Sequence, residues 1–218
     1  MYLCNHRSWG DFFMDQAICN GGAYLSRLLV IIGCPMSSLY AYIAHSTWFF
    51  NRKKGIDRDA LGEYIQSQWL ARPNQGLIVY PEGTRNLKME PLRLKTGVLK
   101  MAFDYQRPVQ AVITTNKERV ANEKDLSYER NVSCVTSISP ALEPHKFESF
   151  EAFVEAVREQ FVETWEDAYS CKPEDAIAYD PPYGLKTPTY EPVPYPRRVW
   201  YARIVIILIA VLVYASRK

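Results

Sequence analysis

Seven of the 14 prolines of this 218-residue chain lie within residues 173–196. Proline fixes its φ angle and has no backbone N–H to donate, so this segment cannot form a regular helix or an interior strand. We therefore predict three parts: a folded domain over residues 1–172, a proline-rich linker over residues 173–196, and a separate C-terminal segment over residues 197–218.

The C-terminal segment is strongly apolar. From Val199 to Ala215 only one charged residue, Arg203, interrupts the run, and aromatic residues such as Trp200 and Tyr214 lie near its ends. A run of this length is close to the roughly 20 apolar residues that span a bilayer, and aromatic residues favour the interfaces. We predict a transmembrane or membrane-anchoring helix here; a buried strand or helix of the folded domain is the alternative.

Charge and cysteine content narrow the function classes. The net charge is only +2, and the basic residues of the C-terminal segment (Arg197, Arg198, Arg203, Arg217 and Lys218) are not balanced there by any acidic residue. A mildly acidic body with a basic, apolar tail indicates a membrane end rather than a nucleic-acid binder. The five cysteines are scattered without a CxxC pair, which argues against a disulfide framework or a zinc site.

Within residues 1–172, strand-like and helix-like segments alternate. We expect strands near 2–4, 47–50, 76–80, 109–114 and 132–138, and helices near 9–19, 57–71 and 96–105. The apolar run from Tyr24 to Gly33 is expected to form a helix, and residues 150–169 an amphipathic helix that packs on the core. This alternation predicts an α/β domain with a mainly parallel or mixed central sheet flanked by helices.

A histidine and a carboxylate lie close together near the start of the chain, at His6 and Asp11. On one regular helix their side chains would diverge by roughly 140°, so a single helix cannot join them. They can meet if His6 ends a strand and Asp11 lies in the first turn of the next helix, with Ser8 as its N-cap. The carboxylate would then orient a general base. A polar loop before a capped helix is the alternative reading.

A second polar stretch follows the apolar run Leu77–Tyr80, in the sequence PEGTRN. Gly83 permits close approach to the backbone, Thr84 can donate a hydrogen bond, and Arg85 carries a planar donor fork suited to phosphate. In α/β sheets such groups belong at the carboxyl ends of strands. The alternative is an ordinary turn in which Glu82 forms a surface salt bridge.

Together these stretches resemble the glycerolipid acyltransferase family. Asn5-His6 with Asp11 is similar to its NHxxxxD block, and Pro81–Arg85 to its PEGTR block. The aromatic strand that ends in Arg52 resembles the family's second block, which precedes PEGTR, and the segments 95–97 and 108–113 resemble the later blocks. The blocks follow the family order and cover about residues 1–115.

The resemblance implies transfer of a fatty acyl group from acyl-CoA to the hydroxyl of lysophosphatidic acid, which gives phosphatidic acid. His6 would be the general base and Asp11 its orienting partner. The acceptor phosphate would be held by Arg52, Glu82, Gly83, Thr84 and Arg85, with Lys95 as a weaker addition. The family also implies acyl-CoA as co-substrate, a lysophospholipid acceptor, a membrane location at the endoplasmic reticulum, and no metal, bound cofactor or nucleic acid.

Three alternatives remain open from the sequence. The acceptor can be another lysophospholipid or glycerol 3-phosphate. Cys4 and His6, two apart on a strand, can form a thiol hydrolase dyad. The chain can also be an inactive, tail-anchored interaction protein. Because such acyltransferases usually carry membrane-associated residues before the NHxxxxD block, we expect a further segment upstream of Met1.

Overall fold

The structure is a computed structural model that describes residues 1–28, 31, 35–43, 45–50, 58–72, 75–122 and 127–178. The chain divides into two compact units, Met1–Ala176 and Ile177–Lys218. Most of the predicted linker and the whole predicted anchor, Val199–Ala215, lie outside the described residues and stay predictions. None of the described helices is long and apolar enough to cross a membrane.

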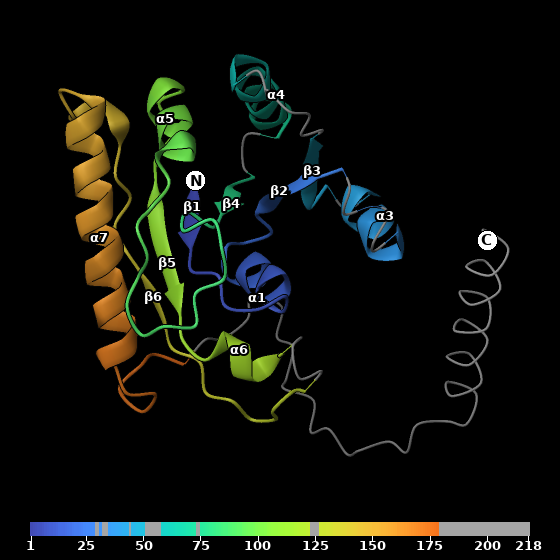
Figure 1. The fold of residues 1–218 in the computed structure, drawn as a ribbon, viewed down its shortest axis with the longest axis vertical. Helices are drawn as coiled ribbons and strands as arrows, with labels where there is room; N and C mark the ends of the chain where they lie inside the picture. Colours follow the sequence, from blue (N-terminus) through green and yellow to red (C-terminus); the bar gives the residue numbers. More distant parts are fainter. Residues whose placement is uncertain are drawn as a thin grey trace, which may run out of the picture. The chain divides into compact units, whose positions relative to one another are not determined.

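A six-stranded sheet with the order β3-β2-β4-β1-β5-β6 forms the centre of the first unit (Figure 1). The neighbouring strands from β3 to β5 in this order are parallel to one another, and β6 runs antiparallel to β5 at the edge. This arrangement confirms the predicted mainly parallel or mixed sheet. The strands are β1 (Tyr2–Cys4), β2 (Ala23–Arg27), β3 (Thr47–Phe50), β4 (Leu77–Val79), β5 (Gln110–Thr114) and β6 (Thr136–Ile138).

Helices lie on both faces of the sheet, as the predicted α/β class requires. Successive residues of a strand point to opposite faces, so Leu3 packs in one cluster with α4, α5 and α7, whereas Cys4 packs with Cys19 at the end of α1. The helices are α1 (Asp11–Ile18), α3 (Pro35–Ile43), α4 (Arg58–Ala71), α5 (Thr96–Asp104), α6 (Lys117–Val120) and α7 (Phe150–Ser170), with a 3₁₀ turn at Pro144–Lys146.

One predicted element is wrong. The run that begins at Tyr24 is not helical over its first residues, because Ala23–Arg27 forms β2 between β3 and β4. A short apolar run suits a buried helix and a buried strand equally well, and here the neighbouring strands decide. Residues 29–30 and 32–33 of the run lie outside the described residues. Helix α3 was not among the predicted elements.

The long helix α7 packs on the core, as its apolar stripe predicts. Ser149 caps it by accepting a hydrogen bond from the Ala152 N–H at 3.1 Å. Its buried side chains include Phe153, Val157 and Trp165. In Figure 1 it runs beside β5 and β6. The stripe is therefore occupied by the protein's own core and is not available for docking on a membrane.

Two valines of α7 test this packing. Val157 is 2% exposed and Val162 is 40% exposed. Val157→Ala removes two buried methyl groups and leaves a cavity, so we expect a loss of about 2 kcal/mol in the free energy of unfolding. Val162→Ala is the matched control, with an expected change within about 0.5 kcal/mol. Urea unfolding measures both, and equal losses would contradict the described packing.

Candidate active site

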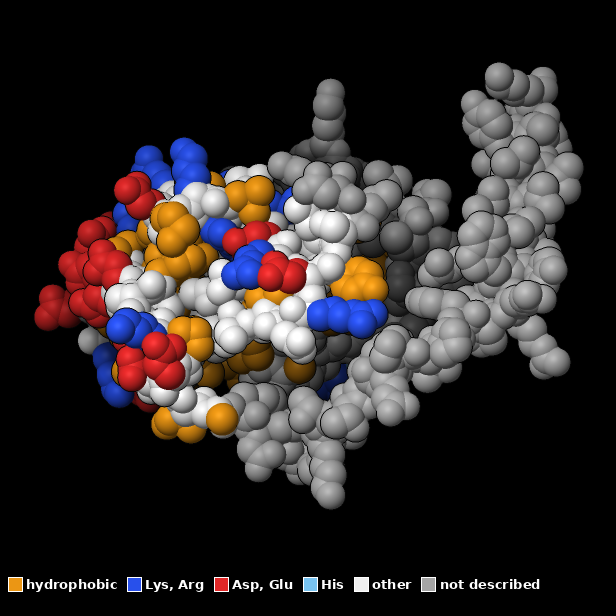
Figure 2. Space-filling view, turned by 90° about the horizontal axis from the view of Figure 1, so that it is seen from below, with side chains coloured by type: hydrophobic (Ala, Val, Ile, Leu, Met, Phe, Trp, Pro, Cys, Tyr) orange, Lys and Arg blue, Asp and Glu red, His pale blue; other side chains and the backbone are white. Residues whose placement is uncertain are grey.

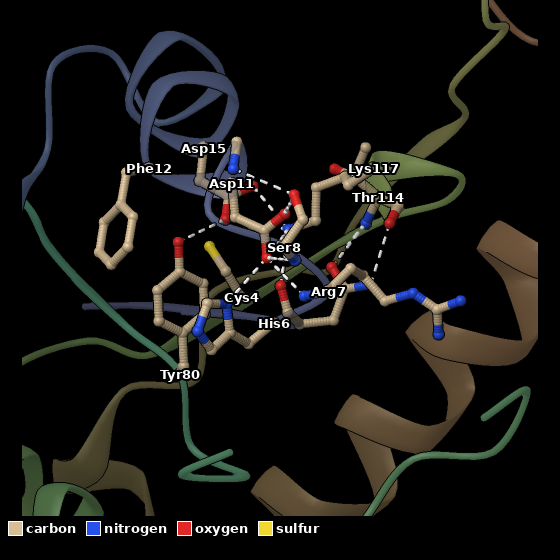
Figure 3. A network of polar contacts seen from close by, with 12 residues as sticks. Cys4, His6, Arg7, Ser8, Asp11, Phe12, Asp15, Tyr80, Thr114 and Lys117 are labelled. Carbon is tan, nitrogen blue, oxygen red and sulfur yellow. Dashed lines mark hydrogen bonds and ion pairs between the residues drawn. The ribbon is translucent and has the colours of Figure 1, made fainter. Parts of the chain in front are cut away.

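Polar residues follow three neighbouring strands of the sheet at their carboxyl ends. His6 lies two residues after β1, Glu82 three residues after β4, and Lys117 three residues after β5, with β1 between the other two strands. Because all three strands are parallel, their carboxyl ends meet at one edge of the sheet. Figure 3 shows the resulting network of side chains.

His6 and Asp11 form the predicted pair. His6 Nδ1 lies 2.8 Å from Asp11 Oδ2, and Asp11 is fully buried. The same carboxylate oxygen accepts hydrogen bonds from the backbone N–H of Arg7 and from that of Ser8, the second at 2.9 Å. Its other oxygen accepts from the Ser8 hydroxyl at 3.1 Å. The loop between β1 and α1 therefore wraps around this one carboxylate.

The predicted N-cap at Ser8 is wrong. The N-cap of α1 is Gly10, without a side-chain cap, and Asp11 is the first helical residue. The Ser8 hydroxyl donates to Asp11 and accepts from the Gly10 N–H at 3.0 Å. Since it serves the loop and the carboxylate, it does not cap the helix.

The charge state of Asp11 determines which imidazole nitrogen is free. Burial alone would raise the pKa of Asp11, but the hydrogen bond from His6 and the charge of Lys117, whose Nζ lies 3.9 Å away, hold that pKa below its usual value. An ionised carboxylate only accepts hydrogen bonds, so the proton between the two side chains belongs to Nδ1. Nε2 then keeps its lone pair, on a side chain that is 17% exposed.

Aromatic rings fix the plane of the imidazole. The Tyr80 ring stacks on His6 with centroids 4.2 Å apart and planes inclined by 17°, as Figure 3 shows. Phe12 meets the imidazole edge to face at 6.0 Å. The Tyr80 hydroxyl donates to Asp15 Oδ2 at 3.0 Å, which holds the stacked ring in place. His6 is thus oriented through its edge by Asp11 and through its face by Tyr80.

Glu82 lies beneath the loop that follows β4. It is 3% exposed, and its Oε1 accepts hydrogen bonds from the Asn86 side-chain amide and from the Leu92 N–H, both at 2.7 Å. Burial raises the pKa of Glu82, and these two hydrogen bonds oppose that rise. The Asn86 N–H in turn donates to the His6 carbonyl at 2.8 Å. The loop is therefore tied to the segment that carries the base.

Gly83, Thr84 and Arg85 form one exposed part of this loop. Gly83 has a φ of +72°, which strains any residue with a side chain, and a Cβ at this position would lie 2.4 Å from Lys95 Nζ. The ammonium of the exposed Lys95 therefore lies against the loop. Arg52, the remaining predicted phosphate ligand, lies outside the described residues.

Several residues of the site were not predicted from the sequence. Arg7 is buried, forms two hydrogen bonds with the Glu118 carboxylate at 2.7 and 2.9 Å, and donates to the carbonyls of Asn86 and Lys88. Asp15 carried a usable signal, because it lies four residues after Asp11 on the same helical face. The other missed residues are Tyr80, Asn86 and Lys117. The partners of Tyr80 and Lys117 are distant in sequence, so no local spacing identifies them, whereas the bond from Asn86 to Glu82 spans only four residues.

The thiol hydrolase alternative does not agree with this geometry. Cys4 is fully buried, and its Sγ lies 3.9 Å from Cys19 Sγ. Burial raises the pKa of the Cys4 thiol well above its usual value. A nucleophilic cysteine needs an accessible thiolate, and this environment disfavours one.

Two known proteins are similar to this chain, one in sequence and one in fold. The chain is 27% identical over 121 residues to a 1-acyl-sn-glycerol-3-phosphate acyltransferase of Cocos nucifera; the match covers 53% of this chain and 37% of that protein. The chain therefore spans little more than a third of that relative. Its fold is similar to the crystal structure of the 1-acyl-sn-glycerophosphate acyltransferase PlsC of Thermotoga maritima, with a TM-score of 0.60 and 19% identity over 78% of this chain and 66% of that one.

The family follows from a third comparison. The sequence model described as Acyltransferase matches residues 1–115, which is more than half of the chain. This range includes His6, Asp11 and the whole loop after β4. The chain belongs to the Acyltransferase family.

Proposed function

We propose that this chain transfers a fatty acyl group from acyl-CoA to the free hydroxyl of lysophosphatidic acid, which yields phosphatidic acid. The observation that carries the proposal is the His6–Asp11 pair, 2.8 Å apart, beside a loop with exposed Thr84 and Arg85. Membership of the Acyltransferase family and the similarity to a 1-acyl-sn-glycerol-3-phosphate acyltransferase support it.

His6 acts as the general base of this reaction. Nε2 removes the proton of the acceptor hydroxyl while the hydroxyl oxygen attacks the thioester carbonyl. Asp11 keeps Nδ1–H in place and stabilises the imidazolium that forms. When the tetrahedral intermediate collapses, the new C–O bond remains and the C–S bond breaks. The departing CoA thiolate takes the proton from His6, so the base is regenerated without a metal or a bound cofactor.

The acceptor phosphate binds at the loop after β4. Arg85 provides a planar fork for two phosphate oxygens, Thr84 provides a hydroxyl, and Lys95 provides a second positive charge next to Gly83. Arg52 is a further proposed ligand. Glu82 is buried and its carboxylate is used within the loop, so we propose that it shapes the phosphate site rather than contacting the phosphate.

A membrane surface is the natural place for this reaction, because the acceptor is a lipid. Large apolar side chains reach the surface near the site: Trp9 is 62% exposed, Phe13 76% and Met89 66%. On the face shown in Figure 2, hydrophobic side chains lie among charged ones.

We propose a location at the endoplasmic reticulum membrane, with residues 197–218 as the anchor. Membrane pelleting at high salt, with and without these residues, tests the anchor.

A pair of histidine variants tests the catalytic role. We expect His6→Ala to lower kcat/KM by roughly 10²- to 10⁴-fold, because the base is lost. His145→Ala is the matched control, since that side chain is 64% exposed and pairs with Glu143 at the surface. The assay follows radiolabelled acyl-CoA with lysophosphatidic acid, other lysophospholipids and glycerol 3-phosphate. Equal rates for both variants on every acceptor would contradict the proposal.

An arginine pair tests the phosphate site. Arg85→Ala removes a charge-assisted contact, so we expect KM for lysophosphatidic acid to rise about 10-fold or more. KM for acyl-CoA should change much less. The control is Arg158→Ala, whose side chain on α7 pairs with Glu155. If Arg85→Ala changed both KM values equally, the assignment of Arg85 to the acceptor would be wrong.

A further inference from the structure

A buried ammonium group lies behind the His6–Asp11 pair. Lys117, the first residue of α6, is fully buried. Its Nζ donates to both oxygens of Asp15 at 2.9 Å and to the carbonyl of Asn5 at 2.6 Å, and it lies 3.9 Å from Asp11 Oδ2. Figure 3 shows this lysine above the strand ends, next to the two carboxylates. Lys117 takes no direct part in the proposed proton transfer.

Helix α1 turns its acidic face inward. Asp11 and Asp15 are both fully buried, while Phe12 is 39% and Phe13 76% exposed. A surface helix normally buries its apolar residues, and a buried carboxylate needs a partner. The inward face of α1 therefore depends on a cation, and Lys117 is the ammonium group in contact with it.

Both contacts that orient His6 start from this lysine. Along one route, Lys117 attracts Asp11, and Asp11 binds Nδ1 of the imidazole. Along the other route, Lys117 binds Asp15, Asp15 accepts from the Tyr80 hydroxyl, and the Tyr80 ring stacks on the imidazole. The contact at the edge of the imidazole and the contact on its face therefore both depend on the buried charge of Lys117.

The charges of this cluster balance only when His6 carries a proton. Two carboxylates and one ammonium carry a net charge of −1 while the imidazole is neutral, and the cluster becomes neutral when His6 accepts a proton. A net charge is costly to bury, so the balance of these charges matters to every member of the cluster. Burial raises the pKa of Asp15 to about 6, and the attraction of Lys117 works against that rise and favours the ionised form.

We propose that Lys117 is a positioning residue for His6, and that its buried charge, balanced against Asp11 and Asp15, sets the proton affinity of the base. The consequence for catalysis rests on the proposed function; the effect on proton binding does not. Other ionisable groups next to the cluster are Cys4 on β1, Tyr24 on β2, Tyr80 and Glu82 after β4, Glu118 on α6 with its partner Arg7, and Cys134 before β6.

Two variants separate this role from simple packing. Asp15→Asn keeps the shape and the acceptor for Tyr80 but removes one negative charge. The double variant Asp15→Asn/Lys117→Met removes both charges of the ion pair and restores the original net charge. NMR titration of the full-length protein in detergent, with ¹³C-labelled histidine, follows the ring of His6; the chain has only three histidines, and His6→Ala identifies the signal.

We expect Asp15→Asn to move the titration midpoint of the His6 ring down by about one pH unit, because a nearby negative charge is lost. The double variant should return it to within about 0.3 pH unit of the wild-type value. A midpoint unchanged by Asp15→Asn would overturn the proposal, and this single variant decides even where the double variant does not fold. A double variant that folds but stays displaced would also overturn it.

Acyl-transfer rates add a second readout. We expect kcat to fall about 10-fold or more in Asp15→Asn, with the double variant recovering at least half of that loss on a logarithmic scale. If kcat fell in the double variant by as much as in Asp15→Asn or by more, and thermal stability fell in parallel, the role of Lys117 would be merely structural. If the wild type transfers no acyl group while the midpoints move as expected, the proposed function fails and the role of Lys117 stands.

Discussion

The carboxylate of Asp11 holds the segment between β1 and α1 in its conformation. It accepts hydrogen bonds from the backbone of Arg7 and Ser8, from the Ser8 hydroxyl and from His6 Nδ1. A buried N–H that loses its partner costs about 1–3 kcal/mol, so the loop has this shape only while the carboxylate is present and ionised. The same carboxylate therefore fixes both the orientation of the imidazole and the path of the backbone around it.

Long-range contacts make the three strand ends a rigid frame. Asn5 exchanges two hydrogen bonds with the backbone of Thr114, at 2.9 and 3.0 Å, and so continues the pairing of β1 with β5 past the last strand residue. On the other side, the Asn86 N–H binds the His6 carbonyl. Arg7 joins that loop to α6 through Glu118. A general base needs a fixed position relative to its substrate, and these contacts supply it.

Sequence patterns predicted those parts of the site that depend on residues close together in the chain. The strand before Tyr80 and the turn at Gly83 were predicted because an apolar run ends in turn residues, and the His6–Asp11 contact because a strand end and a helix start follow each other closely. The cap at Ser8 was mispredicted because its hydroxyl also has Asp11 as a partner. Lys117 was beyond reach, since its contact with Asn5 spans 112 residues.

The central claim is that Asp11 holds the proton of a neutral His6 on Nδ1 and leaves Nε2 free as the base. Nitrogen-15 NMR of the imidazole, recorded above the titration of His6, distinguishes the two tautomers directly. The structure predicts a protonated Nδ1 and a bare Nε2 in the wild type, with loss of this preference in Asp11→Ala. A neutral His6 that carries its proton on Nε2 in the wild type would contradict the account.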